Sequence, residues 1–199
     1  MIDYYCYLRG KYWAMQTNNK IIWNSNYSKL LCYQKAVVIY DLTFHFCKRF
    51  IDIKDRTHDQ MIQAARSGKQ NIVEGHADMA TSKEGGLKLF NVARGSLLEL
   101  LEDYKDYLRV RNMRLWEDNS IEVKVMAKLG VEYSDSQYFV GLAESRTDDV
   151  VANIAIVLIR QALSLITKYI DRVSENFSKE GGFRERMTQI RLNTRNKTK

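Results

Sequence analysis

The chain has 199 residues, contains no proline, and carries 31 Lys and Arg against 24 Asp and Glu. Its length fits one main domain with a small appendage, and the absence of proline favours long uninterrupted helices. Hydrophobic residues make up 45% and charged residues 28% of the chain, which excludes a wholly disordered chain and a polytopic membrane protein. We therefore expect an all-α protein.

The first segment, residues 1–28, is rich in Tyr and Trp and has no helical period. We expect an arm that docks on the body or is partly disordered, and Met15 is an alternative start to Met1. Its apolar residues do not form the core of a signal peptide. The three cysteines, Cys6, Cys32 and Cys47, lack the spacing of a disulfide framework or a zinc site. These features favour a cytoplasmic protein.

The bundle is expected over residues 29–179. Apolar residues recur at helical spacing from Lys29 to about Ile53. Thr57, with Gln60 three residues later, fits a capping box and predicts that a second helix begins there and runs to about Asp78. Small residues between Ala64 and Gly68 predict a face on which a neighbouring backbone can approach closely.

A second capping box, Thr81 with Glu84, predicts a third helix to about Asn112. Its apolar seam alternates steps of three and four residues, as in antiparallel bundles. Arg94 interrupts this seam. A cation there must reach solvent or pair with a carboxylate, and Glu74 on the second helix is the candidate partner.

Residues 113–145 break the pattern and predict an insertion with short helices over 121–129 and 137–143. The fourth helix is expected from Thr147 to about Ser178. Its residues 154–159 are all apolar, so the helix is apolar over more than one face. Asn153, Arg160 and Gln161 interrupt the apolar stretch, which disfavours a membrane span. The sequence therefore predicts that the extra apolar surface is buried against another protomer.

The last segment, residues 180–199, is basic. Residues 179–199 contain seven Lys and Arg against two Glu. A short amphipathic helix over 183–192 would place Arg184, Arg191 and Arg195 in a row, and guanidinium rows suit phosphate backbones. A solvated end that keeps the protein soluble is the alternative reading of this charge.

Catalytic and metal-binding motifs are missing from the sequence. The three histidines, His45, His58 and His76, lack the Glu three residues before them that a di-iron bundle requires. No phosphate-binding loop, dinucleotide fingerprint or zinc-protease motif occurs. We expect a protein that is not an enzyme and has no cofactor or metal.

Basic side chains remain as candidate binding residues. Taken together on an oligomer, they would repeat, and repeated phosphate contacts multiply affinity. The candidate nucleic-acid-binding residues are Arg66, Lys69, Lys88, Arg109, Arg111, Arg114, Arg184, Arg191 and Arg195.

Two segments carry a family resemblance. Asn71-Ile-Val-Glu-Gly75 is followed about twenty residues later by Ala93-Arg-Gly-Ser-Leu97. With Tyr33-Gln-Lys-Ala36, these segments resemble the four-helix-bundle proteins encoded in ribosomal-RNA intervening sequences and the accessory variability proteins of diversity-generating retroelements. The chain from Val150 through Met187 resembles the subgroup with a C-terminal four-helix-bundle suffix.

That resemblance implies an up-and-down antiparallel four-helix bundle, a homopentamer, nucleic-acid binding and, in the retroelement members, a reverse transcriptase as partner. It also implies that its motif positions organise the bundle: Asn71, Glu74, Gly75, Arg94 and Glu99. The chain departs from the family at Gly68-Lys69-Gln70, where members commonly have a proline, and in the 113–145 insertion.

The sequence thus predicts a non-catalytic, homo-oligomeric, nucleic-acid-binding helical bundle that contacts RNA or DNA through phosphates and does not act at a membrane. A protein-interaction scaffold whose basic residues only solubilise it is the alternative. A bundle that binds a small molecule or metal is a third reading.

Overall fold

The computed structural model describes residues 26–180, 188 and 191–192. Within these residues the fold is entirely helical, which confirms the all-α prediction. A short 3-10 helix, η2 (Tyr27–Lys29), precedes six α-helices. They are α2 (Leu31–Phe50), α3 (Arg56–Asp78), α4 (Lys83–Val110), α5 (Ile121–Glu132), α6 (Ser136–Glu144) and α7 (Asp148–Glu180). The predicted arm lies outside the described residues up to position 25.

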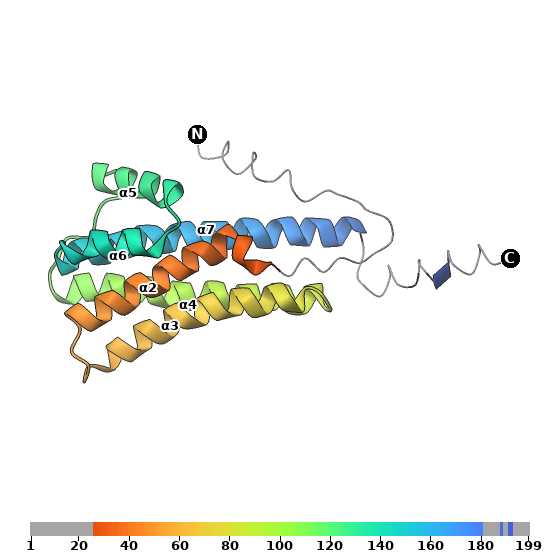
Figure 1. Ribbon diagram of the computed structural model, residues 1–199, viewed down its shortest axis with the longest axis horizontal. Coiled ribbons are helices and arrows are strands. Elements are labelled where there is room, and N and C mark those ends of the chain that lie inside the picture. The colour runs from red at the N-terminus through yellow and green to blue at the C-terminus, as the bar shows by residue number, and fades with distance from the viewer. Residues whose placement is uncertain (1–25, 181–187, 189–190, 193–199) are drawn as a thin grey trace.

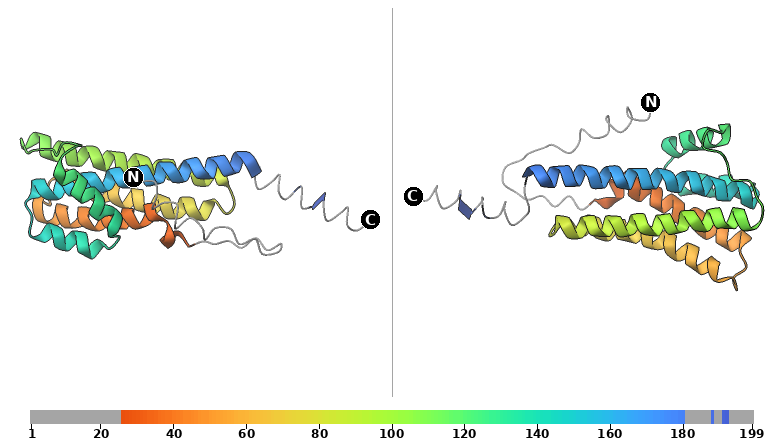
Figure 2. Two further views of the ribbon diagram at one scale, coloured as in Figure 1. Left: turned by 90° about the horizontal axis from the view of Figure 1, so that it is seen from above. Right: turned by 180° about the vertical axis from the view of Figure 1, so that it is seen from behind.

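The four long helices α2, α3, α4 and α7 lie along the long axis of the molecule, and successive ones run in opposite directions (Figure 1). Helices α2 and α4 each contact both α3 and α7. The two short helices lie at one end of the molecule in all three views (Figures 1 and 2). There α6 contacts α2 and α5 contacts α7. The insertion is therefore a cap on one end of the bundle, and it covers the side formed by α2 and α7.

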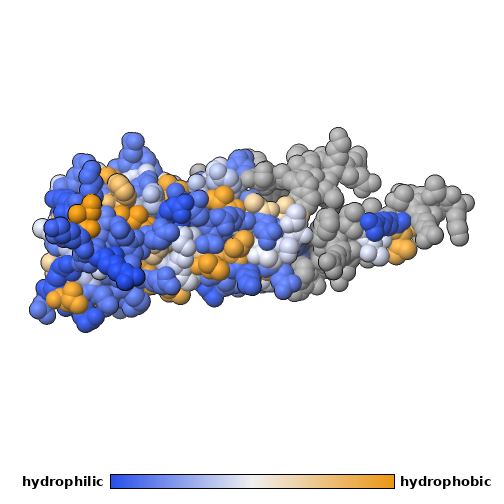
Figure 3. Space-filling view, turned by 90° about the horizontal axis from the view of Figure 1, so that it is seen from below, coloured by the Kyte–Doolittle hydropathy of each residue, from blue (hydrophilic) through white to orange (hydrophobic). Residues whose placement is uncertain are grey.

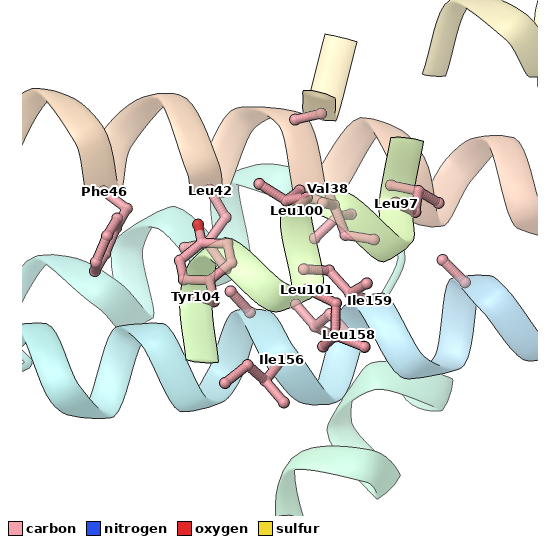
Figure 4. Packing of buried hydrophobic residues seen from close by; sticks show 14 of the residues in the cluster. Val38, Leu42, Phe46, Leu97, Leu100, Leu101, Tyr104, Ile156, Leu158 and Ile159 are labelled. Carbon is pink, nitrogen blue, oxygen red and sulfur yellow. The ribbon is translucent and has the colours of Figure 1, made fainter. Parts of the chain in front are cut away.

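The core forms where the apolar faces of the long helices converge. Leu42 and Phe46 of α2 lie close to Tyr104 of α4 (Figure 4). The rings of Phe46 and Tyr104 have centroids 5.0 Å apart, and both side chains are fully buried. The Tyr104 hydroxyl donates to Thr43 Oγ1 at 3.1 Å, which satisfies both buried hydroxyl groups. Burial raises the pKa of Tyr104 far above its usual range, so the phenol stays neutral.

The small-residue face of α3 packs against α4, as predicted. Gly68 is buried against Leu97, and a Cβ on Gly68 would lie 2.9 Å from the Leu97 side chain. Ser67 and Ser96 share a hydrogen bond of 2.9 Å across the same contact. Small side chains let the two helices approach closely, and the hydroxyl pair fixes their register.

The N-cap residues of α3 and α4 differ from the predicted ones by one or two positions. The side chain of Asp55, not Thr57, caps α3 and accepts from the Thr57 backbone N–H at 2.9 Å. The side chain of Ser82, not Thr81, caps α4 and accepts from the Gly85 N–H at 3.0 Å. Asp, Ser and Thr are all good N-cap residues, so composition could not choose between neighbours.

Helix α4 ends in a motif that reverses the chain into the insertion. Asn112 has a positive φ of 54°. The Met113 N–H donates to the Leu108 carbonyl at 2.9 Å, and the Asn112 N–H donates to the Arg109 carbonyl at 3.1 Å. These are the paired bonds of a Schellman cap, in which asparagine tolerates the left-handed conformation.

The apolar residues 154–159 of α7 are covered within one chain, whereas Leu163, Leu165 and Ile170 further along the helix are half-buried. Burial of α7 against another protomer stays a prediction. Every residue from Val151 to Ile159 is buried. Helices α2 and α4 cover one side of α7, and α5 lies on another. Residues 148–176 are long and apolar enough to cross a membrane, but 61% of that apolar window is buried inside the fold. Packing inside the protein accounts for this composition, as in core helices of other bundles.

The polar residues that interrupt α7 hold the insertion. Asn153, buried within the core, donates to the Arg114 carbonyl at 2.9 Å and accepts from the Trp116 N–H at 2.8 Å. Eight residues further along α7, Gln161 donates to the Ala127 carbonyl of α5 at 2.7 Å. These bonds supply partners for backbone groups of the insertion.

Two cations of α2, Lys35 and Arg49, also hold the insertion. The buried Lys35 ammonium donates to the Gly130 carbonyl near the end of α5. Arg49 donates to the Ala143 carbonyl at the end of α6 at 2.8 Å. The last carbonyls of a helix lack partners within it and carry partial negative charge. Lys35 and Arg49 therefore act as C-caps supplied by another helix.

Candidate nucleic-acid interface

The predicted basic residues of the bundle are spread along its length. Arg66 and Lys69 lie in the middle of α3, Lys88 lies near the start of α4, and Arg109 lies near its end. At about 1.5 Å per helical residue, Lys88 and Arg109 are roughly 30 Å apart. The structure does not bring these residues into one cluster.

Arg66 is exposed, whereas Lys69 is half-buried. The Lys69 ammonium lies over the ring of Tyr40 on α2, 4.3 Å from its centroid. This cation–π contact joins α2 to α3 and accounts for Lys69 without a ligand.

Three further cations have partners inside the chain. Arg109 pairs with Asp106 at 2.8 Å, and Arg114 pairs with Glu122 at 3.2 Å. The third, Arg111, lies over the ring of its neighbour Tyr107, 3.8 Å from the centroid. All three guanidinium groups are exposed, but two have their charge balanced by a neighbouring carboxylate.

Lys88 and Arg191 are exposed to solvent, and Arg191 is helical. Arg184 and Arg195 lie outside the described residues. The predicted row of three guanidinium groups therefore stays a prediction.

The excess positive charge lies outside the helical body. Residues 26–180 contain 22 Lys and Arg and 22 Asp and Glu, so this part of the chain is formally neutral. Residues 181–199 contain six Lys and Arg and one Glu, and residues 1–25 contain three and one. A long-range attraction for an anionic polymer therefore originates from the two ends of the sequence.

The motif residues fall into two groups. Gly75 is buried against α4, and half-buried Asn71 donates to the Ser67 carbonyl at 2.9 Å. Glu74 and Glu99 are exposed. The glycine thus lies at the contact between α3 and α4, the Asn71 amide bonds within α3, and the two carboxylates face solvent.

The predicted ion pair between Glu74 and Arg94 is wrong: among the described residues, no salt bridge joins them. Arg94 is half-buried beside the seam, while Ala93 and Leu97 fill the core positions. Arg94 is next to the core position of Ala93, and a long side chain at the edge of the core can extend its guanidinium group to solvent.

The two cysteine thiols of the body, those of Cys32 and Cys47, are buried, and burial disfavours their reactive thiolate form. Burial raises the pKa of Cys32 and the pKa of Cys47 to about 12 each. A thiol is nucleophilic as the thiolate, and burial disfavours that form. In the described ranges, no group of three or more His, Cys, Asp and Glu side chains is arranged to hold a metal ion.

The residues that fasten the insertion were not among those predicted from the sequence. Lys35 and Arg49 are fourteen positions apart, which places them on one face of α2. Lys35 is 6% exposed, and burial lowers the pKa of its ammonium from the usual 10.5 to about 8. The signal was present in α7, where Asn153 and Gln161 interrupt an otherwise apolar helix. A polar side chain there predicts a buried backbone partner.

The surface seen in Figure 3 is mainly hydrophilic, and its hydrophobic residues form separate patches.

In comparisons with known proteins, no family model, no curated protein and no solved structure matches the chain.

Proposed function

We propose that this chain is a non-catalytic, cytoplasmic protein that binds RNA or DNA through phosphate contacts made by its basic C-terminal segment, residues 180–199. The observation that carries the proposal is the separation of charge. The helical body is formally neutral, while six Lys and Arg against one Glu occupy residues 181–199. The body then serves as a platform from which the basic segment extends.

The type of contact follows from this charge distribution. Each phosphate neutralised by Lys or Arg releases a condensed counterion, so affinity falls steeply with salt. Phosphate contacts carry no base information, so we expect little sequence preference. Arg66, Lys69 and Lys88 are too dispersed on the neutral body to supply this attraction alone.

We further propose that the body is an up-and-down antiparallel four-helix bundle of the intervening-sequence protein family. The contacts of α2 and α4 with both α3 and α7 support this topology. The packing of Gly75 against α4 supports the role that the resemblance gives to its motif. We also propose that the chain self-associates as a homopentamer, the assembly that the resemblance implies.

A binding experiment tests the nucleic-acid proposal. Affinity for a generic RNA hairpin and a DNA duplex is measured between about 50 and 200 mM salt, where several phosphate contacts lose orders of magnitude in affinity. A triple variant, Arg184→Glu with Arg191→Glu and Arg195→Glu, should abolish retention. A control variant, Lys54→Glu with Lys124→Glu and Arg146→Glu, makes the same change in net charge on exposed residues of the body that are not binding candidates, and it should retain most of the affinity.

A protein-interaction scaffold is the second candidate. The pairing of Arg109 with Asp106 and of Arg114 with Glu122 favours it, because these cations are already balanced inside the chain. The scaffold predicts that both triple variants retain whatever weak nucleic-acid affinity the protein has. Equal behaviour of the two variants would therefore reject the nucleic-acid proposal in favour of the scaffold.

A further inference from the structure

Helix α2 is shorter than α7, the helix it packs against. Lys35 donates to the Gly130 carbonyl, and a Cβ on Gly130 would overlap the Gln161 side-chain oxygen, so Lys35 and Gln161 lie at one level of the bundle. Because α2 and α7 run antiparallel, one helical turn further places Leu31 of α2 beside Leu165 of α7. Helix α2 begins there, whereas α7 continues to its end at residue 180, about 22 Å further (Figure 1).

One row of α7 residues loses its cover at this level. Residues that follow one another at steps of four and three are fully buried in the first half of the helix: Val151, Ala155, Leu158 and Ala162. The same row continues with Leu165 and Tyr169, which are half-buried, and Val173 one turn later is half-buried as well. The change coincides with the start of α2, so the row is open where α2 no longer runs beside it.

The inner side of this row is well packed. The Tyr169 ring lies against Phe90 of α4, with centroids 4.6 Å apart, and the Tyr169 hydroxyl donates to the Met79 sulfur at 3.6 Å. Burial raises the pKa of Tyr169 to about 12, and the nearby Cys32 of α2 adds to the rise. Tyr169 therefore belongs to the core on one side and borders the line of α2 on the other.

Leu31 completes an apolar surface with these residues. It is the first residue of α2 and is 39% exposed. We call this surface the open face. It consists of Leu31, Leu165, Tyr169 and Val173.

The apolar segment nearest to the open face is the end of the N-terminal arm. Residues 21–23, Ile-Ile-Trp, come shortly before η2, which contacts α2 and α3. Three residues separate Trp23 from Asn26, so the chain can place them at most about 10 Å apart. The basic C-terminal segment is a poorer match, because Arg172 is exposed at the edge of the open face and repels a like charge.

We propose that residues 21–23 dock on the open face of their own chain and bury Trp23 against Leu165 and Tyr169. The segment takes the place beside α7 that a longer α2 would fill. An indole supplies a large apolar area for such a contact. Met1 and Met15, the two candidate start residues, both retain this segment.

Tryptophan fluorescence tests the docking. In a Trp13→Phe, Trp116→Phe background, Trp23 is the one tryptophan of the full chain. Leu31→Glu places a carboxylate on the open face and should raise the acrylamide quenching constant of Trp23 about twofold or more, because the indole loses its apolar contacts. Ile121→Glu is the matched control, since Ile121 is also an exposed first residue of a helix, and it should leave the quenching unchanged. A carboxylate in the first turn is favourable in both helices.

A spin label locates the contact without altering the open face. In the same background with Cys6→Ser, a nitroxide attached at Arg172→Cys should quench Trp23, whereas one attached at Lys124→Cys of α5 should not. The two remaining cysteines are buried and should stay unlabelled. Dilution of the labelled chain into an excess of unlabelled, tryptophan-free chain should leave the quenching unchanged, because the contact lies within one chain.

Three outcomes would overturn the proposal. The first is a Trp23 that acrylamide quenches as strongly in the native state as in urea. The second is a nitroxide at position 172 that does not quench Trp23, or that does so only between chains. The third is a Leu31→Glu variant that loses mass in sedimentation velocity while Trp23 stays shielded, which would assign the open face to another protomer. Neither nucleic-acid binding nor the pentamer is required for the docking, so each can fail separately.

Discussion

Gly75 of α3 and Gly86 of α4 pack backbone against backbone. A Cβ on Gly75 would lie 2.9 Å from the Gly86 carbonyl oxygen, and a Cβ on Gly86 would lie 2.7 Å from the Gly75 carbonyl oxygen. This reciprocal contact brings the two helices together near the turn that joins them. It also explains why a buried motif glycine is needed at position 75, in a helix interior where alanine would otherwise be better.

Substitution at this crossing should therefore destabilise the fold. Gly75→Ala should lower the free energy of unfolding by about 1–3 kcal/mol, because overpacking outweighs the gain in helix propensity. Urea unfolding followed by circular dichroism measures the change. The exposed Gly141→Ala, where added atoms have room, should instead raise stability slightly. Equal effects at the two glycines would show that the close contact does not restrict position 75.

The buried Lys35 ammonium should make stability depend on pH. Burial lowers the pKa of Lys35 from 10.5 to about 8, so the folded state binds fewer protons than the unfolded state between these values. Its contribution to stability is fully present above pH 10.5 and is lost as pH falls towards 8. Over that interval the natural chain should gain about 3 kcal/mol relative to Lys35→Met.

Comparison with Lys35→Met isolates this effect. Burial also raises the pKa values of Cys32 and Cys47, which oppose it above pH 9 in both proteins. Urea unfolding of each protein at a series of pH values gives the difference directly. A difference that is constant from pH 7 to 10.5 would mean that Lys35 is not held in a desolvated site.

Loss of the Asn153 side chain should release the start of the insertion. Asn153→Leu leaves the Trp116 N–H and the Arg114 carbonyl without their side-chain partner, which should cost about 1–3 kcal/mol. Hydrogen exchange at the Trp116 amide should accelerate, and proteolysis should occur between residues 111 and 120. Arg160→Gln, which removes the ion pair with Asp118, should change stability by less than about 1 kcal/mol. Unchanged exchange at Trp116 in Asn153→Leu would contradict this role.

The body thiols should be inert until the protein unfolds. In a Cys6→Ser background, Cys32 and Cys47 are the remaining cysteines, and both are buried with pKa values of about 12. A thiol reagent at pH 8 should label neither in the native state and both in urea. Rapid native labelling of either thiol would reopen the question of a nucleophilic cysteine.

Helical periodicity was enough to predict the long helices and the small-residue face of α3 that packs against α4. Spacing of apolar and small residues reports which side of a helix is buried, and Ala64, Gly68 and Ile72 all lie on that side. The end of the third long helix was predicted at about Asn112, within two residues of the observed end of α4 at Val110. Capping residues were missed by one or two positions, because Asp55 and Thr57, or Thr81 and Ser82, are equally good caps by composition.

The sequence by itself determined that the chain is helical, where its charge lies, and that α7 has apolar residues on more than one side. Only the tertiary structure decided what covers them. The insertion does so, because Lys35, Arg49, Asn153 and Gln161 bind its backbone and hold α5 and α6 against the body. Such contacts join residues far apart in sequence, and a local pattern cannot specify which buried polar group will meet which carbonyl. The same limit explains the incorrect Glu74–Arg94 pair.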